Sequence, residues 1–286
     1  MKQLLILSGK GGTGKTTTAA AFIRFAGAKA MADCDVDAPN LEIVTNFKEN
    51  PQVKAFTGSD KARIDSIKCI GCKECALKCR FGAIKTIGNI CVIDEYACEG
   101  CGVCSYVCPQ GAVSLLKDVA GEQQLYCGEK TFSTARLKMG RGNSGKLVSA
   151  VKQDMVKNSP EEAELAIIDG SPGIGCPVIA SVSGVDLVLV VAEPSMSGLS
   201  DLERLVKTAN NFGTKMAVCV NKWDISPENT VYIEEFCKEK GLAFVGKVPY
   251  DKSASAAINS GLSVAEFDCP ARDALKDVYI NTIKLL

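Results

Sequence analysis

The start of the chain joins a short apolar run, Leu4–Leu7, to a glycine-rich loop that ends in lysine and threonine. The loop reads Gly9-Lys10-Gly11-Gly12-Thr13-Gly14-Lys15-Thr16, and a stretch with helical periodicity follows from about residue 15 to residue 25. Glycines in this pattern let backbone N–H groups turn toward phosphate oxygens, and the helix N-terminus adds a favourable field. A strand, this loop and a helix in succession therefore predict a nucleotide-binding α/β domain.

Two side chains of this loop carry the chemistry that the motif predicts. Lys15 would reach the β- and γ-phosphates, and the hydroxyl of Thr16 would ligate Mg²⁺. We expect the nucleotide to contact Gly11, Gly12, Thr13, Gly14, Lys15, Thr16 and Thr17.

Short apolar runs alternate with longer amphipathic stretches through the outer parts of the chain. The runs are nearly continuous in apolar residues, which is typical of parallel strands buried on both faces. We expect strands at Leu4–Leu7, Lys29–Ala32, Leu165–Ile168, Leu187–Val191, Met216–Val220 and Ala243–Lys247. The pattern predicts an α/β fold with a mostly parallel sheet flanked by helices. Further helices are expected near residues 200–212 and 271–286, the second of them docked on the core.

Eight of the 15 cysteines form two runs with the same internal spacing. The first is Cys69-x2-Cys72-x2-Cys75-x3-Cys79, and the second, 29 residues later, is Cys98-x2-Cys101-x2-Cys104-x3-Cys108. The helical period of the outer parts is lost between about residues 59 and 118. We therefore predict a small α+β domain at 59–118, inserted into a discontinuous domain formed by residues 1–58 and 119–286.

The amino-acid composition limits the kinds of metal site and binding partner that the chain can have. The 286 residues include no histidine, so metal sites must be built from Cys, Asp, Glu or hydroxyl groups. Many cysteines without a secretory signal favour metal binding in a reducing cytoplasm over disulfide bonds. A formal net charge of zero argues against nucleic-acid binding by electrostatics alone. The N-terminal apolar run is too short to span a membrane, and we expect no integral membrane segment.

The cysteine spacing resembles that of bacterial two-cluster ferredoxins, in which the fourth cysteine of each run ligates the other cluster. The resemblance implies two [4Fe–4S] clusters, one on Cys69, Cys72, Cys75 and Cys108 and the other on Cys79, Cys98, Cys101 and Cys104. Structural zinc is the competing use of paired Cys-x2-Cys motifs.

The surroundings of the two runs differ from the ferredoxin pattern and from each other. Arg80 stands where the pattern usually has proline. Basic residues accompany the first run and acidic residues the second: Lys68, Lys73, Lys78, Arg80 and Lys85 against Asp94, Glu95 and Glu99. If these charges lie close to their clusters, the potentials are unequal and the higher one is beside the basic group.

The loop contains a lysine, Lys10, in addition to Lys15. With this extra lysine the loop resembles the variant loop of the MinD, ParA and nitrogenase-iron-protein class of ATPases. The resemblance implies a nucleotide-dependent homodimer, or a heterodimer with a paralogue, in which Lys10 reaches the partner's phosphates as an arginine finger does. It also implies that Asp35 orients the attacking water and that Asp33 and Asp169 support Mg²⁺. A solvated loop lysine is the alternative for Lys10.

The segment Asn221-Lys222-Trp223-Asp224 follows a predicted strand and matches the guanine-reading motif of GTPases. In the resembled class, the counterpart of Asn221 contacts adenine, and a segment like Pro249-Tyr250-Asp251 packs against the ring. The ATPase type of the loop favours ATP, and the four-residue match leaves GTP open.

Two further features are ambiguous. The segment 140–146 repeats the Gly-x4-Gly-Lys pattern, but Leu147 replaces the hydroxyl and no strand precedes it, so we expect a loop that leads into a helix. Cys176 lies seven residues after Asp169, the offset at which the nitrogenase iron protein holds a dimer-bridging cluster. A bridge would need a second cysteine near residues 140–145, where the sequence has none.

Over its whole length the chain resembles MinD-superfamily ATPases that carry an inserted ferredoxin domain. We therefore expect an ATP-hydrolysing iron–sulfur protein whose nucleotide state gates electron transfer or cluster delivery to a redox or metalloprotein partner. One alternative is a positioning or assembly switch of the MinD and ParA kind, with structural or redox-sensing clusters. The other is a metal or iron–sulfur cluster chaperone.

Overall fold

The computed structural model describes residues 1–45, 47 and 50–286, and it divides the chain into two units. The larger unit comprises Met1–Val53, Gln123–Arg136 and Ser144–Leu286. The smaller unit comprises Lys54–Glu122 and Leu137–Asn143. Its long segment encloses the span 59–118 that the sequence marks as an insertion.

The main sheet of the described residues has nine strands in the order β13-β12-β11-β1-β10-β2-β9-β8-β3. All six predicted strands are present, as β1 (Lys2–Leu7), β2 (Ala30–Asp33), β10 (Leu165–Asp169), β11 (Leu187–Ala192), β12 (Lys215–Asn221) and β13 (Ala243–Val248). These six and β9 (Thr131–Leu137) pair in parallel. Their residues are mostly buried, as expected of strands covered on both faces. The predicted α/β architecture is therefore confirmed.

Three strands of this sheet were not predicted: β3 (Gln52–Thr57), β8 (Val119–Cys127) and β9. All but one residue of β3 is exposed, and β8 mixes exposed with buried residues, so neither reads as a continuous apolar run. Residues of all three strands fall in both units. These strands therefore carry the chain between the two units: β3 and β9 into the smaller one and β8 back into the larger one.

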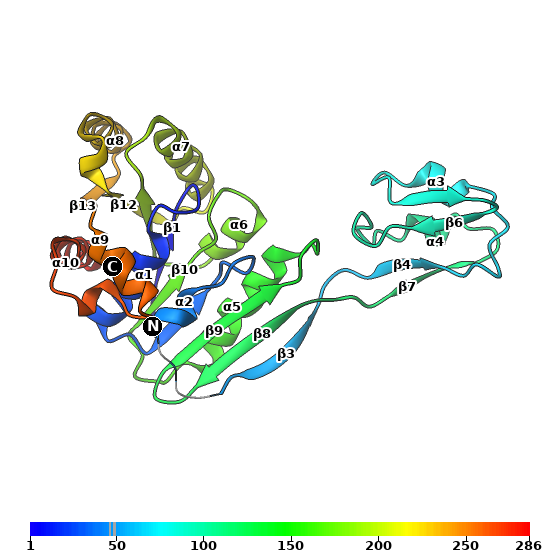
Figure 1. The fold of residues 1–286 in the computed structure, drawn as a ribbon, viewed down its shortest axis with the longest axis horizontal. Coiled ribbons are helices and arrows are strands. Elements are labelled where there is room, and N and C mark those ends of the chain that lie inside the picture. Colours follow the sequence, from blue (N-terminus) through cyan, green and yellow to red (C-terminus); the bar gives the residue numbers. More distant parts are fainter. Residues whose placement is uncertain (46, 48–49) are drawn as a thin grey trace. The chain divides into compact units, whose positions relative to one another are not determined.

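Helices cover both faces of the main sheet (Figure 1). α1 (Lys15–Ala26) and α10 (Pro270–Ile283) pack together, with the rings of Phe22 and Tyr279 edge to face and their centroids 5.2 Å apart. α10 confirms the expected C-terminal helix on the core. The other helices of this unit are α2 (Leu41–Thr45), α5 (Ser144–Asn158), α6 (Cys176–Val182), α7 (Met196–Asn210), α8 (Pro227–Lys240) and α9 (Lys252–Asn259). Among the described residues, no helix has the length and apolar character needed to cross a membrane.

The smaller unit consists of two similar halves related by a shift of 29 residues. β4 (Lys61–Ile64) pairs antiparallel with β7 (Val113–Leu116), and β6 (Ile90–Ile93) pairs antiparallel with β5 (Ile84–Ile87). Adding 29 to the numbers of β4 gives β6, and subtracting 29 from β7 gives β5, with the same register. The short helices α3 (Glu74–Lys78) and α4 (Val103–Tyr106) follow the same shift.

Two glycines show how strictly this repeat constrains the backbone. Gly71 and Gly100 have φ angles of 67° and 69°, in the left-handed region that favours glycine. A Cβ atom would lie 2.3 Å from the carbonyl oxygen of Asn89 at the first position and 1.9 Å from that of Asp60 at the second. The loop after the first cysteine of each run therefore passes against the opposite half in the same way.

A buried lysine ties α5 to the end of α6. The side chain of Lys152 is 8% exposed, and its Nζ donates to the carbonyl oxygens of Ala180, Ser181 and Ser183 at 3.4, 2.7 and 2.6 Å. Carbonyls at the end of a helix have no partner within the helix. Burial lowers the pKa of Lys152, and the three acceptors make its burial tolerable.

Replacing Lys152 by methionine should lower the free energy of unfolding by about 1–3 kcal/mol, because buried carbonyls lose their donor. Chemical denaturation of the purified protein measures this change. Lys146→Met is the matched control, since Lys146 is exposed on the same helix. Equal stability of the two variants would show that the contacts of Lys152 contribute nothing.

Candidate functional site

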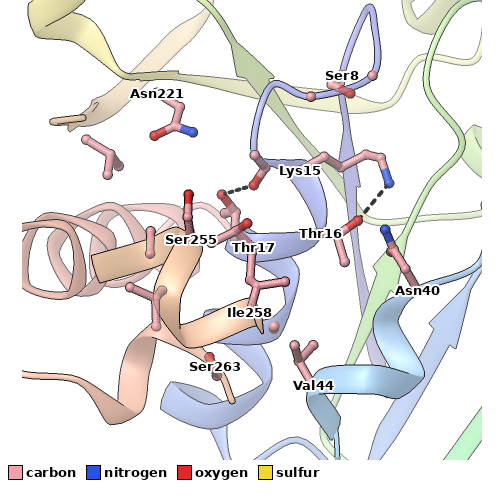
Figure 2. A pocket seen from close by; sticks show the side chains of 18 of the residues that line it. Ser8, Lys15, Thr16, Thr17, Asn40, Val44, Asn221, Ser255, Ile258 and Ser263 are labelled. Carbon is pink, nitrogen blue, oxygen red and sulfur yellow. Dashed lines mark hydrogen bonds between the residues drawn. The ribbon is translucent and has the colours of Figure 1, made fainter. Parts of the chain in front are cut away.

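A pocket of about 720 Å³ lies in the larger unit at the carboxyl ends of the parallel strands. Its walls include residues that directly follow β1, β2, β10, β12 and β13. Ligands of open α/β sheets bind at this edge, and the volume is typical of cofactor sites. Figure 2 shows Lys15, Thr16 and Asn40 on one side of the pocket and Asn221 on another. Most of the predicted nucleotide contacts line it: Gly11, Gly12, Gly14, Lys15, Thr16, Thr17, Asp35, Asn221, Pro249, Tyr250 and Asp251.

Residues at the end of β12 donate hydrogen bonds to the glycine loop. The Nδ2 of Asn221 donates to the carbonyl oxygen of Thr13 at 2.7 Å, and the Nζ of Lys222 donates to that of Gly12 at 3.0 Å. Gly14 is the N-cap of α1 with φ of 95°, and a Cβ atom there would lie 2.2 Å from Asn221 Nδ2. The loop therefore requires glycine at this position both for its backbone angle and for its contact with β12.

Lys15 and Thr16 both contact Asp169. The Nζ of Lys15 lies 2.6 Å from Asp169 Oδ1 and 3.8 Å from Asp35 Oδ2. The hydroxyl of Thr16 donates to Asp169 Oδ2 at 2.6 Å. The Lys15 side chain is only 6% exposed and Asp169 is fully buried. The predicted phosphate-binding lysine and two of the three predicted Mg²⁺ partners, Thr16 and Asp169, are thus brought together.

An excess of carboxylates shapes the electrostatics of this site. Burial by itself lowers the pKa of Lys15, but Asp169, Asp35 and Asp33 raise it, and the net shift is upward. Burial and then the charge of Asp169 raise the pKa of Asp33 to about 7, and burial raises the pKa of Asp35. Three acids around one ammonium leave a negative site with hard oxygen donors. That donor set suits Mg²⁺, which prefers carboxylate, hydroxyl and phosphate oxygens.

Asp33 accepts hydrogen bonds from three backbone N–H groups. Its Oδ1 accepts the N–H of Asp35 at 2.9 Å, and its Oδ2 accepts those of Asn40 and Leu41, both at 3.0 Å. Like Asp169, Asp33 is fully buried and is not among the residues that line the pocket. With three backbone donors on its two oxygens, Asp33 fastens the loop that carries Asp35 and the start of α2.

Lys10 also lies outside the pocket within a single chain. Its Nζ forms an ion pair with Glu193 Oε2 at 2.7 Å and donates to the hydroxyl of Ser197 at 3.2 Å. Lys222 approaches the other oxygen of Glu193 at 3.8 Å. Glu193 was not predicted from the sequence, although it directly follows β11, much as Asp33 and Asp169 end β2 and β10. Glu193 restrains the lysine that the family resemblance assigns to a partner's nucleotide.

The segment predicted to face the base is fixed by two aspartates. The backbone N–H of Tyr250 donates to Asp224 Oδ1 at 2.7 Å. Asp251 Oδ1 accepts the N–H of Ser253 at 2.8 Å and caps α9. Apolar residues that the sequence did not single out complete this side of the pocket: Ile43, Val44, Ala254, Ile258 and Leu262. Four of them lie on the short helices α2 and α9, Leu262 follows α9, and no sequence motif marks these positions.

Two small hollows in the smaller unit each bring together four cysteines taken from both runs. The first is lined by Cys69, Cys72, Cys75 and Cys108, and also by Cys91, which belongs to neither run. The second is lined by Cys79, Cys98, Cys101 and Cys104. In each hollow, the fourth cysteine of one run joins the first three of the other. These are the two sets that the ferredoxin resemblance implies.

The chemistry of these hollows fits iron–sulfur clusters. The N–H groups of Cys91 and Ala62 donate to the sulfurs of Cys69 and Cys98, both at 3.5 Å, and the Cys91 amide lowers the pKa of the Cys69 thiol. Donors of this kind favour thiolates, the form that ligates iron. Among the described residues, no three His, Cys, Asp or Glu side chains converge closely enough for a single metal ion. Cluster ligands do not need to converge in this way, because each cysteine binds a different iron.

The charges around the two hollows are less segregated than the sequence suggests. Lys78 and Arg80 belong to the first cysteine run, but they flank Cys79, which lines the second hollow. Because Cys79 lines the second hollow, two of the basic residues that accompany the first cysteine run lie next to a ligand of the second site.

The second Gly-x4-Gly-Lys segment has a structural role. It is a loop leading into α5, as expected, and Leu147 is buried on that helix. Arg141 pairs with Glu95 at 3.0 Å and with Asp118 at 3.2 Å. The segment therefore fastens the smaller unit internally and does not resemble a phosphate-binding loop in its contacts.

Gly14→Ala should weaken ATP binding at least tenfold, about 1.4 kcal/mol, because the added Cβ displaces Asn221 and distorts the loop. Calorimetric titration with ATP and Mg²⁺ measures the affinity. Gly27→Ala is the control, since Gly27 ends the same helix with φ of 55° and open space around it. It carries the cost of a left-handed alanine, about 1–2 kcal/mol, but should keep its affinity. Equal affinities would refute the close packing.

Comparison with known proteins agrees with this geometry. The sequence profile of the CobQ/CobB/MinD/ParA nucleotide binding domain matches residues 4–264. An uncharacterised protein of Methanocaldococcus jannaschii is 31% identical over 97% of this chain and 95% of its own length. An iron–sulfur cluster carrier protein of Pyrococcus furiosus is 30% identical over 49% of this chain and 53% of its own. The fold is similar to that of the P. furiosus cell division ATPase MinD, with a TM-score of 0.59, 16% identity and coverage of 100% and 99% of the two chains. The chain belongs to the CobQ/CobB/MinD/ParA family of nucleotide-binding proteins.

Proposed function

We propose that the chain is an ATP-hydrolysing iron–sulfur protein in which the nucleotide state of the larger unit controls two [4Fe–4S] clusters held by the smaller unit. The observation that carries the proposal is the pair of hollows, each lined by the crossed set of four cysteines. A nucleotide pocket on the same chain supports the coupling, because two sites in one polypeptide can bias each other's free energy.

ATP is favoured over GTP because Asp224 already accepts a hydrogen bond from the protein backbone. In the guanine-reading motif, this carboxylate accepts from two donors on the base, N1–H and the amino group. Here Asp224 Oδ1 already accepts the N–H of Tyr250. Reading guanine would compete with this bond, and the base segment would lose an anchor.

Hydrolysis would use the residues gathered around Lys15. The ammonium of Lys15 exchanges Asp169 for the phosphate oxygens when nucleotide binds, and Thr16 and Asp169 are then free to hold Mg²⁺ and its water. Magnesium supplies charge neutralisation for the transferred phosphoryl group. Asp35, which lines the pocket next to Lys15, orients the attacking water.

A mechanical connection to the smaller unit begins at the loop that follows Asp169. This loop leads to Cys176 at the start of α6, where a Cβ on Gly145 would lie 3.2 Å from the Cys176 carbonyl oxygen. Gly145 is the second residue of α5, and residues 137–143 directly before that helix belong to the smaller unit. A nucleotide-driven shift of the loop therefore reaches a segment that continues into the smaller unit.

ATP with Mg²⁺ should shift the midpoint potential of at least one cluster relative to ADP with Mg²⁺. Anaerobic redox titration followed by EPR measures this shift in the protein loaded with iron and sulfide. Lys15→Ala is the control, because it retains the cysteines but should lose the nucleotide response. Identical potentials in all nucleotide states, with ATP shown to bind, would contradict gating of electron transfer.

Cluster delivery is the second candidate, and it is favoured by relatives that are named iron–sulfur cluster carrier proteins. Cys72 and Cys101, one from each hollow, are exposed, so an acceptor's thiolates could reach them. In the same preparation, ATP-dependent transfer of ⁵⁵Fe to an apo-ferredoxin with unchanged potentials would select delivery over electron transfer.

A nucleotide-dependent dimer is part of the proposal, and Glu193 should oppose it. Lys10 must leave Glu193 before it can reach a partner's phosphates. Glu193→Gln should therefore lower the ATP concentration needed for dimerisation roughly two- to fivefold, as expected for a partly exposed pair. Sedimentation velocity at increasing ATP measures the effect. Glu203→Gln, an exposed glutamate on α7, is the control, and equal midpoints would exclude a restraining role for Glu193.

A further inference from the structure

Among the positions that line the hollows, one pair differs in whether it carries a buried thiol. Cys91 on β6 and Ala62 on β4 are related by the 29-residue shift, and they line the first and the second hollow respectively. Each donates its backbone N–H to a cysteine sulfur at 3.5 Å, Cys91 to Cys69 and Ala62 to Cys98. The backbone is thus the same at both hollows, and only the side chain differs.

The thiol of Cys91 lies against a predicted ligand. Cys91 is 3% exposed and packs with Cys75 and Ile84 in a buried group. Cys91 and Cys75 also line the same hollow. The four cysteines of this hollow already supply one ligand for each iron of a [4Fe–4S] cluster, so Cys91 is a fifth thiol. A neutral thiol is a weak donor, and a sulfur bound to iron is its acceptor here.

We infer that Cys91 donates a hydrogen bond to the Cys75 sulfur and makes the cluster at the first hollow the easier of the two to reduce. The inference rests on the proposed function, since it requires both clusters. Hydrogen bonds to cluster sulfurs offset the negative charge that an added electron brings, and this raises the reduction potential. The methyl group of Ala62 offers no such donor to the second cluster. An electron that enters the protein should therefore reduce the cluster at the first hollow in preference to the other cluster.

The charged residues that line the hollows favour the same order, because Lys73 lines the first and Glu99 lines the second. The basic residues next to the cysteines in sequence are divided between the two sites. Lys68 and Lys73 accompany the first hollow, but Lys78 and Arg80 flank Cys79 at the second. Positive charge near a cluster raises its potential, so basic residues act on both sites. The buried thiol of Cys91 acts on one site only.

The test is an EPR-monitored redox titration of the full chain, loaded with iron and sulfide and reduced with dithionite. Cys91→Ala should lower one of the two midpoint potentials and leave the other unchanged. Ala62→Cys is the reciprocal variant, and it should raise the potential that Cys91→Ala leaves unchanged. Cys91→Ser keeps a donor and should retain a potential above that of Cys91→Ala. Iron and sulfide are measured in every sample.

The outcomes separate the inference from the function on which it rests. Wild-type protein that binds far less than about eight iron atoms per chain removes the proposed function itself. Full iron content with an unchanged potential in Cys91→Ala and in Ala62→Cys overturns only the role of Cys91. Loss of about half of the iron in Cys91→Ala also overturns it, because Cys91 would then be a ligand.

Discussion

The buried contact between Lys15 and Asp169 joins the elements from which the nucleotide site is built. Lys15 begins α1, Asp169 ends β10, and Asp35 follows β2, so one ammonium gathers three adjacent parts of the sheet. A charge buried this deeply is stable only when it is paired and hydrogen-bonded. In the proposed mechanism, this pairing must open before Lys15 can bind phosphate. The same ion pair would then contribute both to the structure of the site and to its response to nucleotide.

The smaller unit is organised by repetition in place of a large hydrophobic core. Its buried apolar groups are small and include the cysteines themselves. A unit of this size with so little apolar burial has limited stability of its own. Iron–sulfur clusters would add the missing cohesion, as metals commonly do in small domains. Loading with iron and folding of this unit are thus expected to be linked.

Two acids, Glu193 and Asp224, fix the positions of neighbouring groups near the nucleotide pocket. Glu193 engages both Lys10 and Lys222, while Asp224 anchors Tyr250. Each acid follows a parallel strand of the sheet, at the edge where ligands bind. They hold the groups that would contact nucleotide or a partner in defined positions before either one arrives.

Much of this organisation was predictable from the chain alone. The six buried strands, the phosphate loop and the two cysteine runs depend on local patterns, because periodicity and motif spacing are set by backbone geometry. The exposed strands β3 and β8 were missed, since their apolar residues do not form a continuous run. The apolar wall formed by Ile43 and Ile258 was also missed, because these residues lie on short helices that no sequence motif marks.

The sequence by itself predicted the family, which the comparisons confirm, and it also predicted the phosphate-binding residues and the two sets of four cysteines. Only the tertiary structure decided that Asp33 accepts three backbone N–H groups, that Glu193 pairs with Lys10, and that Cys91 and Ala62 occupy equivalent positions at the two hollows. The reason is physical. Motifs report residues that are near in sequence, whereas a buried contact depends on which strands the fold makes adjacent.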